Sequence, residues 1–72
     1  MRRIKKIFVQ SSAIEALGYY APEKILRVWF TTGKIYDYYD VTLTEFENLK
    51  AAASIGEYYN YHIRKYNYQK VK

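Results

Sequence analysis

Alternating hydrophobic and polar positions over residues 26–38 predict a β-hairpin, because two β-prone runs flank a turn that contains Gly33. A three-residue loop at 31–33 would place Gly33 in the left-handed conformation that such loops need. That loop sets Arg27 directly opposite Asp37, whereas a two-residue loop separates the two charges. Each matched cross-strand pair adds about 0.2–1 kcal/mol, so the three-residue loop is favoured.

The hairpin is predicted to belong to a three-stranded antiparallel meander. Residues 13–20 predict its first strand, in which Gly18 permits a bulge or the close approach of another segment. Pro22 predicts the turn that follows. One face of the hairpin is apolar or aromatic throughout and needs a cover: Leu26, Val28, Phe30, Tyr36 and Tyr38. The opposite face is mixed, as in a sheet with one packed and one solvated side: Ile25, Arg27, Trp29, Ile35, Asp37 and Tyr39.

Helix-start signals follow the sheet. Thr42 and Glu45 have the spacing of a capping box, which predicts a helix over 43–53 with Glu45 pointing outward. Ser54 begins a second box, and the apolar spacing after it predicts a short helix at 55–64. The predicted fold is therefore α+β: a three-stranded antiparallel meander packed on one face by one helix, with a second short C-terminal helix.

The length of 72 residues allows one small domain, which buries about 60% of its unfolded surface. We expect a basic N-terminal segment at 1–12, extended or partly disordered, and a folded domain at 13–66. Residues 67–72 are either a basic tail or an extra edge strand. Without cysteine no disulfide framework exists, and no apolar run reaches the roughly 20 residues of a membrane span. The N-terminus lacks the features of a signal peptide, so we expect a cytoplasmic protein with no membrane partner.

Positive charge is concentrated at the two ends of the chain. The basic residues there are Arg2, Arg3, Lys5, Lys6, Arg64, Lys65, Lys70 and Lys72, with no acid in 1–14 or 58–72. If the ends lie close together, they form one basic region. Such a region is typical of a surface that binds phosphate, and equally of charged tails that keep a tyrosine-rich domain soluble.

Trp29, Tyr39 and Arg27 are predicted to share the mixed face of the sheet. Three interpretations of this aromatic patch remain open. It is covered internally by the segment 4–9 or by the second helix, it is buried against another protein, or it stacks nucleic-acid bases. Stacking is worth about 1–3 kcal/mol per base and works best beside basic residues.

Little in the sequence is arranged for catalysis. His62 has no acid from Tyr58 onward to orient it, and Ser11 and Ser12 are best explained as turn or cap residues. Asp37 is explained by its arginine partner. We therefore expect no enzyme activity, no metal, no cofactor and no small-molecule substrate.

The ordered set of residues resembles the KTSC domain, a family named for a module at the C-terminus of some lysyl-tRNA synthetases. The resemblance covers about 9–68 and rests on these residues: Ser11, Ser12, Ala13, Ile14, Gly18, Tyr19, Leu26, Val28, Phe30, Gly33, Tyr36, Tyr38, Val41, Ala53, Ser54, Gly56, Tyr58, Tyr59, Asn60, Ile63 and Arg64. Ala13 departs from the asparagine that the family often has after its two serines. The resemblance implies a meander-plus-helix module, a role in RNA binding and no enzymatic activity.

Two functional hypotheses follow. In the first, the protein is a non-catalytic RNA- or other nucleic-acid-binding module, in which Trp29 and Tyr39 stack bases and the basic ends contact phosphates. In the second, the same patch or a free strand edge recruits a protein partner or a second copy of the chain.

Overall fold

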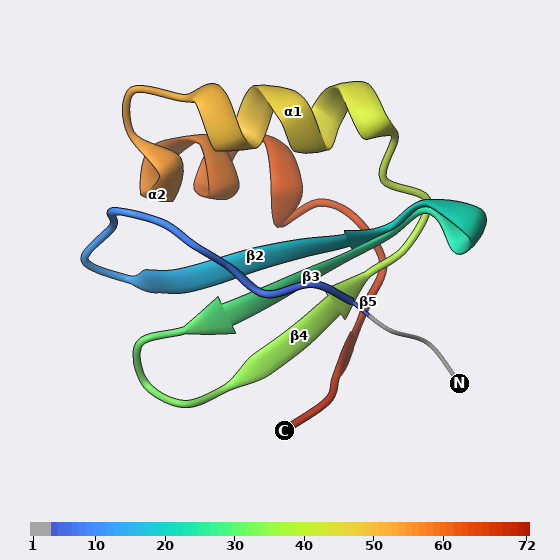
Figure 1. Ribbon diagram of the computed structural model, residues 1–72, viewed down its shortest axis with the longest axis horizontal. Coiled ribbons are helices and arrows are strands. Elements are labelled where there is room, and N and C mark those ends of the chain that lie inside the picture. Colours follow the sequence, from blue (N-terminus) through green and yellow to red (C-terminus); the bar gives the residue numbers. More distant parts are fainter. Residues whose placement is uncertain (1–3) are drawn as a thin grey trace.

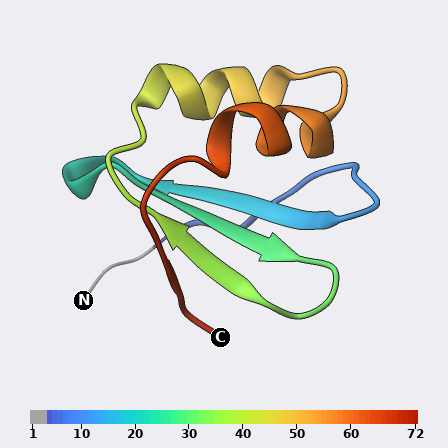
Figure 2. The same ribbon diagram turned by 180° about the vertical axis from the view of Figure 1, so that it is seen from behind.

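The computed structural model describes residues 4–72, which form one antiparallel β-sheet with helices packed on one of its faces (Figures 1 and 2). Within this range the sheet has five strands: β1 (Ile7–Phe8), β2 (Ile14–Tyr20), β3 (Ile25–Phe30), β4 (Ile35–Tyr38) and β5 (Tyr68–Lys70). Strand order in the sheet follows the chain, so β1 and β5 form the opposite edges. The helices are α1 (Leu43–Ala51), α2 (Ile55–Tyr58), the π-helix η2 (Tyr59–Ile63) and the 3₁₀-helix η1 (Ala21–Glu23).

The prediction of a three-stranded sheet is wrong, because the described residues add one strand at each edge. Ile7 and Phe8 pair with β2, so the segment expected to be extended or partly disordered contributes an edge strand. The chain returns after η2, and Tyr68 pairs with Tyr38. For 67–72 the edge-strand alternative is therefore the one observed. Strands of two and three residues are too short to show an alternating pattern in the sequence.

The predicted hairpin register is confirmed. Arg27 pairs with Asp37, and Val28 pairs with Tyr36. The Phe30 amide donates to the carbonyl of Lys34 at 2.9 Å, which closes the three-residue loop. Gly33 has φ +93°, a conformation that L-residues rarely adopt, which explains the glycine.

Both predicted capping boxes start helices, although the helices differ from the expected ones. The Thr42 hydroxyl accepts from the Glu45 amide at 3.1 Å, and the Ser54 hydroxyl accepts from the Glu57 amide at 3.3 Å. Helix α1 ends at Ala51 rather than 53. The helix expected at 55–64 is a single α-turn followed by the π-helix η2.

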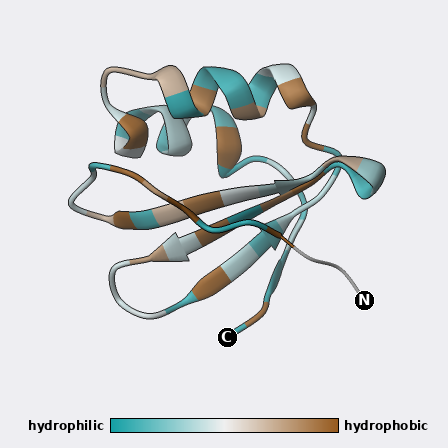
Figure 3. Ribbon diagram, viewed as in Figure 1, coloured by the Kyte–Doolittle hydropathy of each residue, from teal (hydrophilic) through white to brown (hydrophobic). Residues whose placement is uncertain are grey.

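The hydrophobic core lies between the sheet and the helices. Its fully buried side chains come from strands, helices and the segment before α1: Ile14, Leu17, Leu26, Val28, Val41, Leu49 and Ile63. Helix α1 is mostly hydrophilic (Figure 3), and its buried residues are Phe46 and Leu49. The Phe46 ring stacks on Tyr19 at 5.1 Å, and the Tyr19 hydroxyl donates to the Val41 carbonyl at 2.6 Å. The helices are thus packed against one face of the sheet only.

Glu45 does not point outward as predicted. Its carboxylate accepts hydrogen bonds from the hydroxyls of Tyr58 and Tyr66, the second at 2.9 Å. The bond to Glu45 is the main reason that the pKa of Tyr58 is raised. Helix α1 is thereby tied to the segment that follows Ser54. Over 4–72, no helix combines the length and the apolar character needed to cross a bilayer.

Candidate functional site

The face of the sheet that the helices leave open carries a row of hydrophobic side chains. Cross-strand neighbours from β1 to β4 make up the row: Phe8, Ala16, Trp29 and Ile35. Phe8 is 68% exposed, Trp29 is half-buried, and the small Ala16 between them is fully buried. The open face therefore presents a phenyl ring and an indole close to each other.

Lys6 lies over both rings. Its amine is 5.1 Å from the centre of the Phe8 ring and 5.5 Å from that of Trp29. The same amine is 3.1 Å from the carboxylate of Glu15 on β2, which helps to hold it there. A cation over an aromatic face is worth about 0.5–1 kcal/mol at exposed sites. A positive charge thus sits between two partly exposed rings.

The N-terminal segment borders Trp29 without sealing it. Gly18 on β2 lets this segment approach closely. A β-carbon at Gly18 would lie 2.5 Å from Cγ2 of Ile4, 2.6 Å from the carbonyl oxygen of Lys5 and 3.1 Å from Cζ3 of Trp29. The close approach predicted for Gly18 is therefore observed, while the bulge of β2 falls between Ile14 and Ala16. The predicted cover by the N-terminal segment is partial, and the second helix lies on the other face.

Arg27 shares the open face but is engaged with Asp37. Its Nε and Nη2 atoms donate to the two carboxylate oxygens at 2.7 and 2.9 Å, and Asp37 is only 2% exposed. This bond raises the pKa of Arg27. Tyr39 lies on the same face, where its hydroxyl donates to Gln69 at 2.9 Å. The predicted trio therefore lies on one face, where Arg27 and Tyr39 are hydrogen-bonded to neighbours and the half-buried Trp29 ring lies near the Lys6 amine and the Arg27 guanidinium.

The basic residues of the two chain ends do not form one region within 4–72. Lys5 and Lys6 lie at the β1 edge beside the open face. Arg64 and Lys65 follow η2, and Lys70 pairs with Tyr36 and so lies on the helix side. The main chain of Lys72 pairs with Ile35 at the β5 edge. Arg2 and Arg3 lie outside the described residues. Three strands separate the two edges, so only Lys5 and Lys6 are placed beside Trp29.

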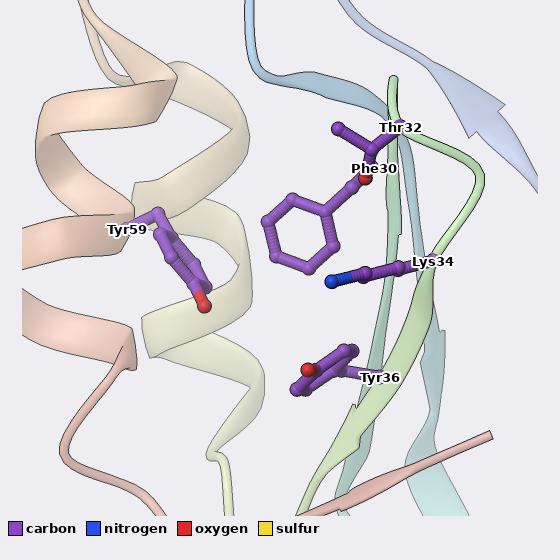
Figure 4. Close-up of a pocket in the computed structure, with 5 residues that line it drawn as sticks. All are labelled: Phe30, Thr32, Lys34, Tyr36 and Tyr59. Atoms are coloured by element: carbon purple, nitrogen blue, oxygen red, sulfur yellow. The ribbon is translucent and has the colours of Figure 1, made fainter. Parts of the chain in front are cut away.

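A groove on the helix side was not predicted. It runs between η2 and the strands, and its lining includes Tyr36 and Tyr59 along its whole length (Figure 4). Tyr36 and Tyr38 were predicted on the apolar face, where they lie. The sequence signal that was available is the high count of ten tyrosines.

Two of the residues considered as catalytic candidates, His62 and Ser11, make contacts that stabilise the local structure. The ring of His62 packs on Tyr58 at 4.3 Å, and the Ser11 hydroxyl accepts from the amides of Ala13 and Ile14 at 3.3 Å each. Within 4–72, no three histidine, cysteine, aspartate or glutamate side chains are grouped closely enough to hold a metal ion.

Comparison with known proteins gives consistent similarities. The KTSC domain model matches residues 10–68. A protein of Tsukamurella paurometabola is 50% identical over 52 residues, which cover 72% of this chain and 78% of that protein. An uncharacterised protein of Stutzerimonas stutzeri is 35% identical over 57 residues, covering 79% and 80%. The crystal structure of a KTSC domain protein from Yersinia pestis matches with a TM-score of 0.93 at 25% identity, over 97% of this chain and 100% of that one.

Proposed function

The chain belongs to the KTSC domain family, and from that starting point we propose that it is a non-catalytic module that binds single-stranded RNA on the open face of its sheet. The observation that carries the proposal is the Lys6 amine above the rings of Phe8 and Trp29. Aromatic rings with an adjacent cation are the elements that single-strand binders use to stack bases and contact the backbone. The resemblance to a synthetase module favours RNA over DNA.

Affinity from this face is expected to be modest. Two stacked bases contribute about 2–6 kcal/mol together, which by itself corresponds to a dissociation constant no tighter than tens of micromolar. Lys5 and Lys6 would supply the phosphate contacts in the described part of the chain. Binding should therefore weaken as salt rises, with a log–log slope of about −0.7 for each phosphate contacted.

The test uses the fluorescence of Trp29, the single tryptophan of the chain. The protein is titrated with a short single-stranded RNA at low and at physiological ionic strength. We expect a change in Trp29 emission at low salt and a weaker affinity at the higher salt. An affinity that does not change with salt, or no binding at low salt, would contradict the proposal.

Matched variants locate the binding face. Phe8→Ala should weaken RNA binding about five-fold or more, whereas Tyr61→Ala removes a 77% exposed ring elsewhere and should leave it unchanged. Lys6→Gln is compared with Lys50→Gln, because Lys50 also lies over a ring, at 4.9 Å from Phe46, and beside a carboxylate, at 3.2 Å from Glu47. Equal effects of the two lysine variants would show that net charge alone drives binding.

The exposed Phe8 ring also supports the alternative, a module for protein interaction or self-assembly. Light scattering during size-exclusion chromatography separates the two functions. A dimer that survives high salt and is lost in Phe8→Ala would favour assembly over RNA binding. The strands at the two edges of the described sheet have two and three residues, which favours a monomer.

A further inference from the structure

The groove on the helix side has the composition of a ligand site that is separate from the open face. Among residues 4–72 it consists of two adjoining hollows of about 230 Å³ each, which share Tyr36 and Tyr59. The remaining lining of the first hollow is Phe30, Thr32 and Lys34. The remaining lining of the second is Tyr38, Arg64 and Tyr68. Figure 4 shows the Lys34 amine pointing into the first hollow, between the rings of Phe30 and Tyr36 and toward Tyr59.

The π-helix is what brings Tyr59 and Arg64 to the same groove. The Arg64 amide donates to the Tyr59 carbonyl at 3.1 Å, five residues back. In an α-helix a residue five positions on lies about 140° round the axis, so the two side chains would diverge. The wider π-turn instead brings Arg64 to nearly the same side of the helix as Tyr59. π-turns are rare, and those that do occur are often found at functional sites. The π-turn is therefore a second feature, independent of the lining residues, that points to this groove.

The groove offers positive charge without a carboxylate to neutralise it. In the part of the chain from 4 to 72, no ion pair joins Lys34 or Arg64 to an acidic side chain, and both residues are exposed. Arg27 and Asp37, by contrast, neutralise each other on the opposite face. An anion that enters the groove would therefore meet two available cations.

The phenols add hydrogen-bond donors. The hydroxyls of Tyr38 and Tyr59 are hydrogen-bonded to each other. Because Tyr38 is only 2% exposed, the pair presents a proton to a ligand when Tyr38 donates to Tyr59 and Tyr59 keeps its own. Burial, followed by the bond to Tyr59, raises the pKa of Tyr38 well above its ordinary 10.0, so the Tyr38 hydroxyl keeps its proton at physiological pH. Proton donors beside two cations suit an acceptor-rich anion.

Aromatic rings form the rest of the lining. Phe30 meets Tyr59 edge to face at 5.4 Å and Tyr36 at 5.7 Å, while Tyr36 stacks on Tyr68 at 5.4 Å. Because the strand rings and Tyr59 already contact one another, a flat apolar group would lie against their outer edges in the hollow rather than between them. We propose that the groove binds a nucleoside monophosphate, with its base against Phe30 and Tyr59 and its phosphate toward Arg64 and the Tyr38–Tyr59 hydroxyl pair.

Charge and size select this ligand class. A phosphate carries about −1.5 to −2 charge at pH 7 and three strong acceptor oxygens, which match Arg64 and the phenol donors of the second hollow better than one carboxylate does, while the Lys34 amine faces the base in the first hollow. Pockets for drug-sized ligands measure about 300–1,000 Å³. One hollow of about 230 Å³ is smaller than that range, and the pair suits a mononucleotide rather than a dinucleotide cofactor. The groove binds this ligand without converting it.

Calorimetric titration tests the proposal with adenosine 5′-monophosphate as the probe. Adenosine and inorganic phosphate are titrated in parallel, and each should bind at least about ten-fold more weakly, because each supplies one of the two groups. Phosphate binding as tightly as the nucleotide would overturn the proposal. Free phosphotyrosine carries a ring and a phosphate in a smaller molecule, so tighter binding of phosphotyrosine would assign the groove to phosphorylated protein and overturn it too.

Variants separate this site from the open face. Lys34→Gln and Arg64→Gln should each weaken binding of the nucleotide about five- to ten-fold. Lys65→Gln, beside Arg64 but not in the lining, should leave it unchanged, and so should Lys6→Gln on the opposite face. Tyr59→Phe keeps the ring and removes the hydroxyl, which tests the donor pair, and urea unfolding of the variant measures separately what the lost bond to Tyr38 costs in stability. A loss in Lys6→Gln rather than Lys34→Gln would place the nucleotide on the open face and refute the groove site.

Discussion

The residue with the greatest influence on the candidate RNA surface is a glycine that makes no side-chain contact. Gly18 is fully covered because the N-terminal segment crosses β2 at this point. The segment carries Lys6, whose amine lies over Trp29. Gly18 therefore decides how closely Lys6 and Trp29 approach. A side chain at this position would separate the basic segment from the aromatic row.

Gly18→Ala is expected to displace the N-terminal segment. The added β-carbon would lie 2.6 Å from the main-chain carbonyl of Lys5, which cannot rotate away as a side-chain tip can. We expect a loss of about 1–3 kcal/mol in the free energy of unfolding, measured with urea, together with greater quenching of Trp29 by acrylamide.

The control for this variant is Gly33→Ala. At Gly33 a β-carbon meets nothing within 4 Å, and the cost comes only from φ +93°, about 1–2 kcal/mol. Gly33→Ala should thus lower stability without changing the quenching of Trp29. Equal quenching in both variants would show that the N-terminal segment does not shield the indole.

At the scale of elements, local signals explain which parts of the fold could be predicted. The hairpin has a glycine at the position that requires it and a charge pair that fits one register only. Thr42 and Ser54 mark helix starts through their own hydrogen bonds. These features are encoded within a few residues of each other. The placement of Trp29 on the open face followed directly from the register.

Elements that depend on distant partners were predicted incompletely. Strand β5 pairs with β4 from the far side of the helices in the sequence, and its three residues carry no pattern that would decide between a basic tail and an edge strand. The apolar spacing after Ser54 is that of an α-helix, and it gives no sign of the π-helix that begins at Tyr59. The groove combines side chains from three strands and from η2, so it exists only in the folded chain. The role of Glu45 was missed because its tyrosine partners lie 13 and 21 residues away.

Glu45→Gln tests how helix α1 is held to the following segment. The carboxylate accepts from two phenols, and a glutamine keeps one acceptor oxygen and no charge. We expect a loss of about 1–2 kcal/mol in unfolding free energy. This is less than the cost of losing a fully buried charged hydrogen bond, because the site is partly exposed. The pKa of Tyr58 should fall toward 10.0, since its bond to Glu45 raises it most. NMR titration of the tyrosine rings measures this shift.

Glu47→Gln is the matched control for Glu45→Gln. Glu47 lies on the same helix, and its carboxylate forms an exposed ion pair with Lys50 at 3.2 Å. The change should cost less than about 0.5 kcal/mol and leave Tyr58 unaffected. A shift of the Tyr58 pKa in this variant would mean that net charge, rather than the hydrogen bond, controls it.

At the scale of the whole molecule, tyrosines add polar and aromatic links between the parts that the aliphatic core packs together. Tyr19 links the sheet to α1 through its stack on Phe46, and Tyr38 links β4 to η2 through Tyr59. Tyr58 and Tyr66 link the C-terminal part to Glu45. The bonds of Tyr58 and Tyr66 to Glu45 require neutral phenols, because a phenolate cannot donate, and the Tyr38–Tyr59 bond requires at least one. The stability of the domain should therefore depend on pH in the alkaline range.

Stability should fall as pH rises above about 10. Within 4–72, the pKa values of Tyr19, Tyr38 and Tyr66 are raised mainly by burial, and that of Tyr58 mainly by its bond to Glu45. The folded state thus holds these protons more tightly than the unfolded chain, whose tyrosines titrate near 10.0. Unfolding then releases protons, and the unfolding free energy drops by up to about 1.4 kcal/mol per pH unit for the buried Tyr38, less for exposed groups.

Urea unfolding at a series of pH values between neutral and strongly alkaline measures this dependence, with tyrosinate absorbance recorded in parallel. Below pH 10 the tyrosine contribution is fully present, and above it we expect a cooperative loss in which ionisation and unfolding coincide. Tyr38→Phe removes the tyrosine whose pKa is raised most strongly. The unfolding free energy of this variant should therefore fall less steeply with pH, even if it is lower than that of the original chain at neutral pH. Tyr61→Phe, at a 77% exposed ring, should keep the steep dependence of the original chain. Tyrosines that ionise independently near pH 10 while the fold remains intact would show that the phenol contacts do not hold the parts together.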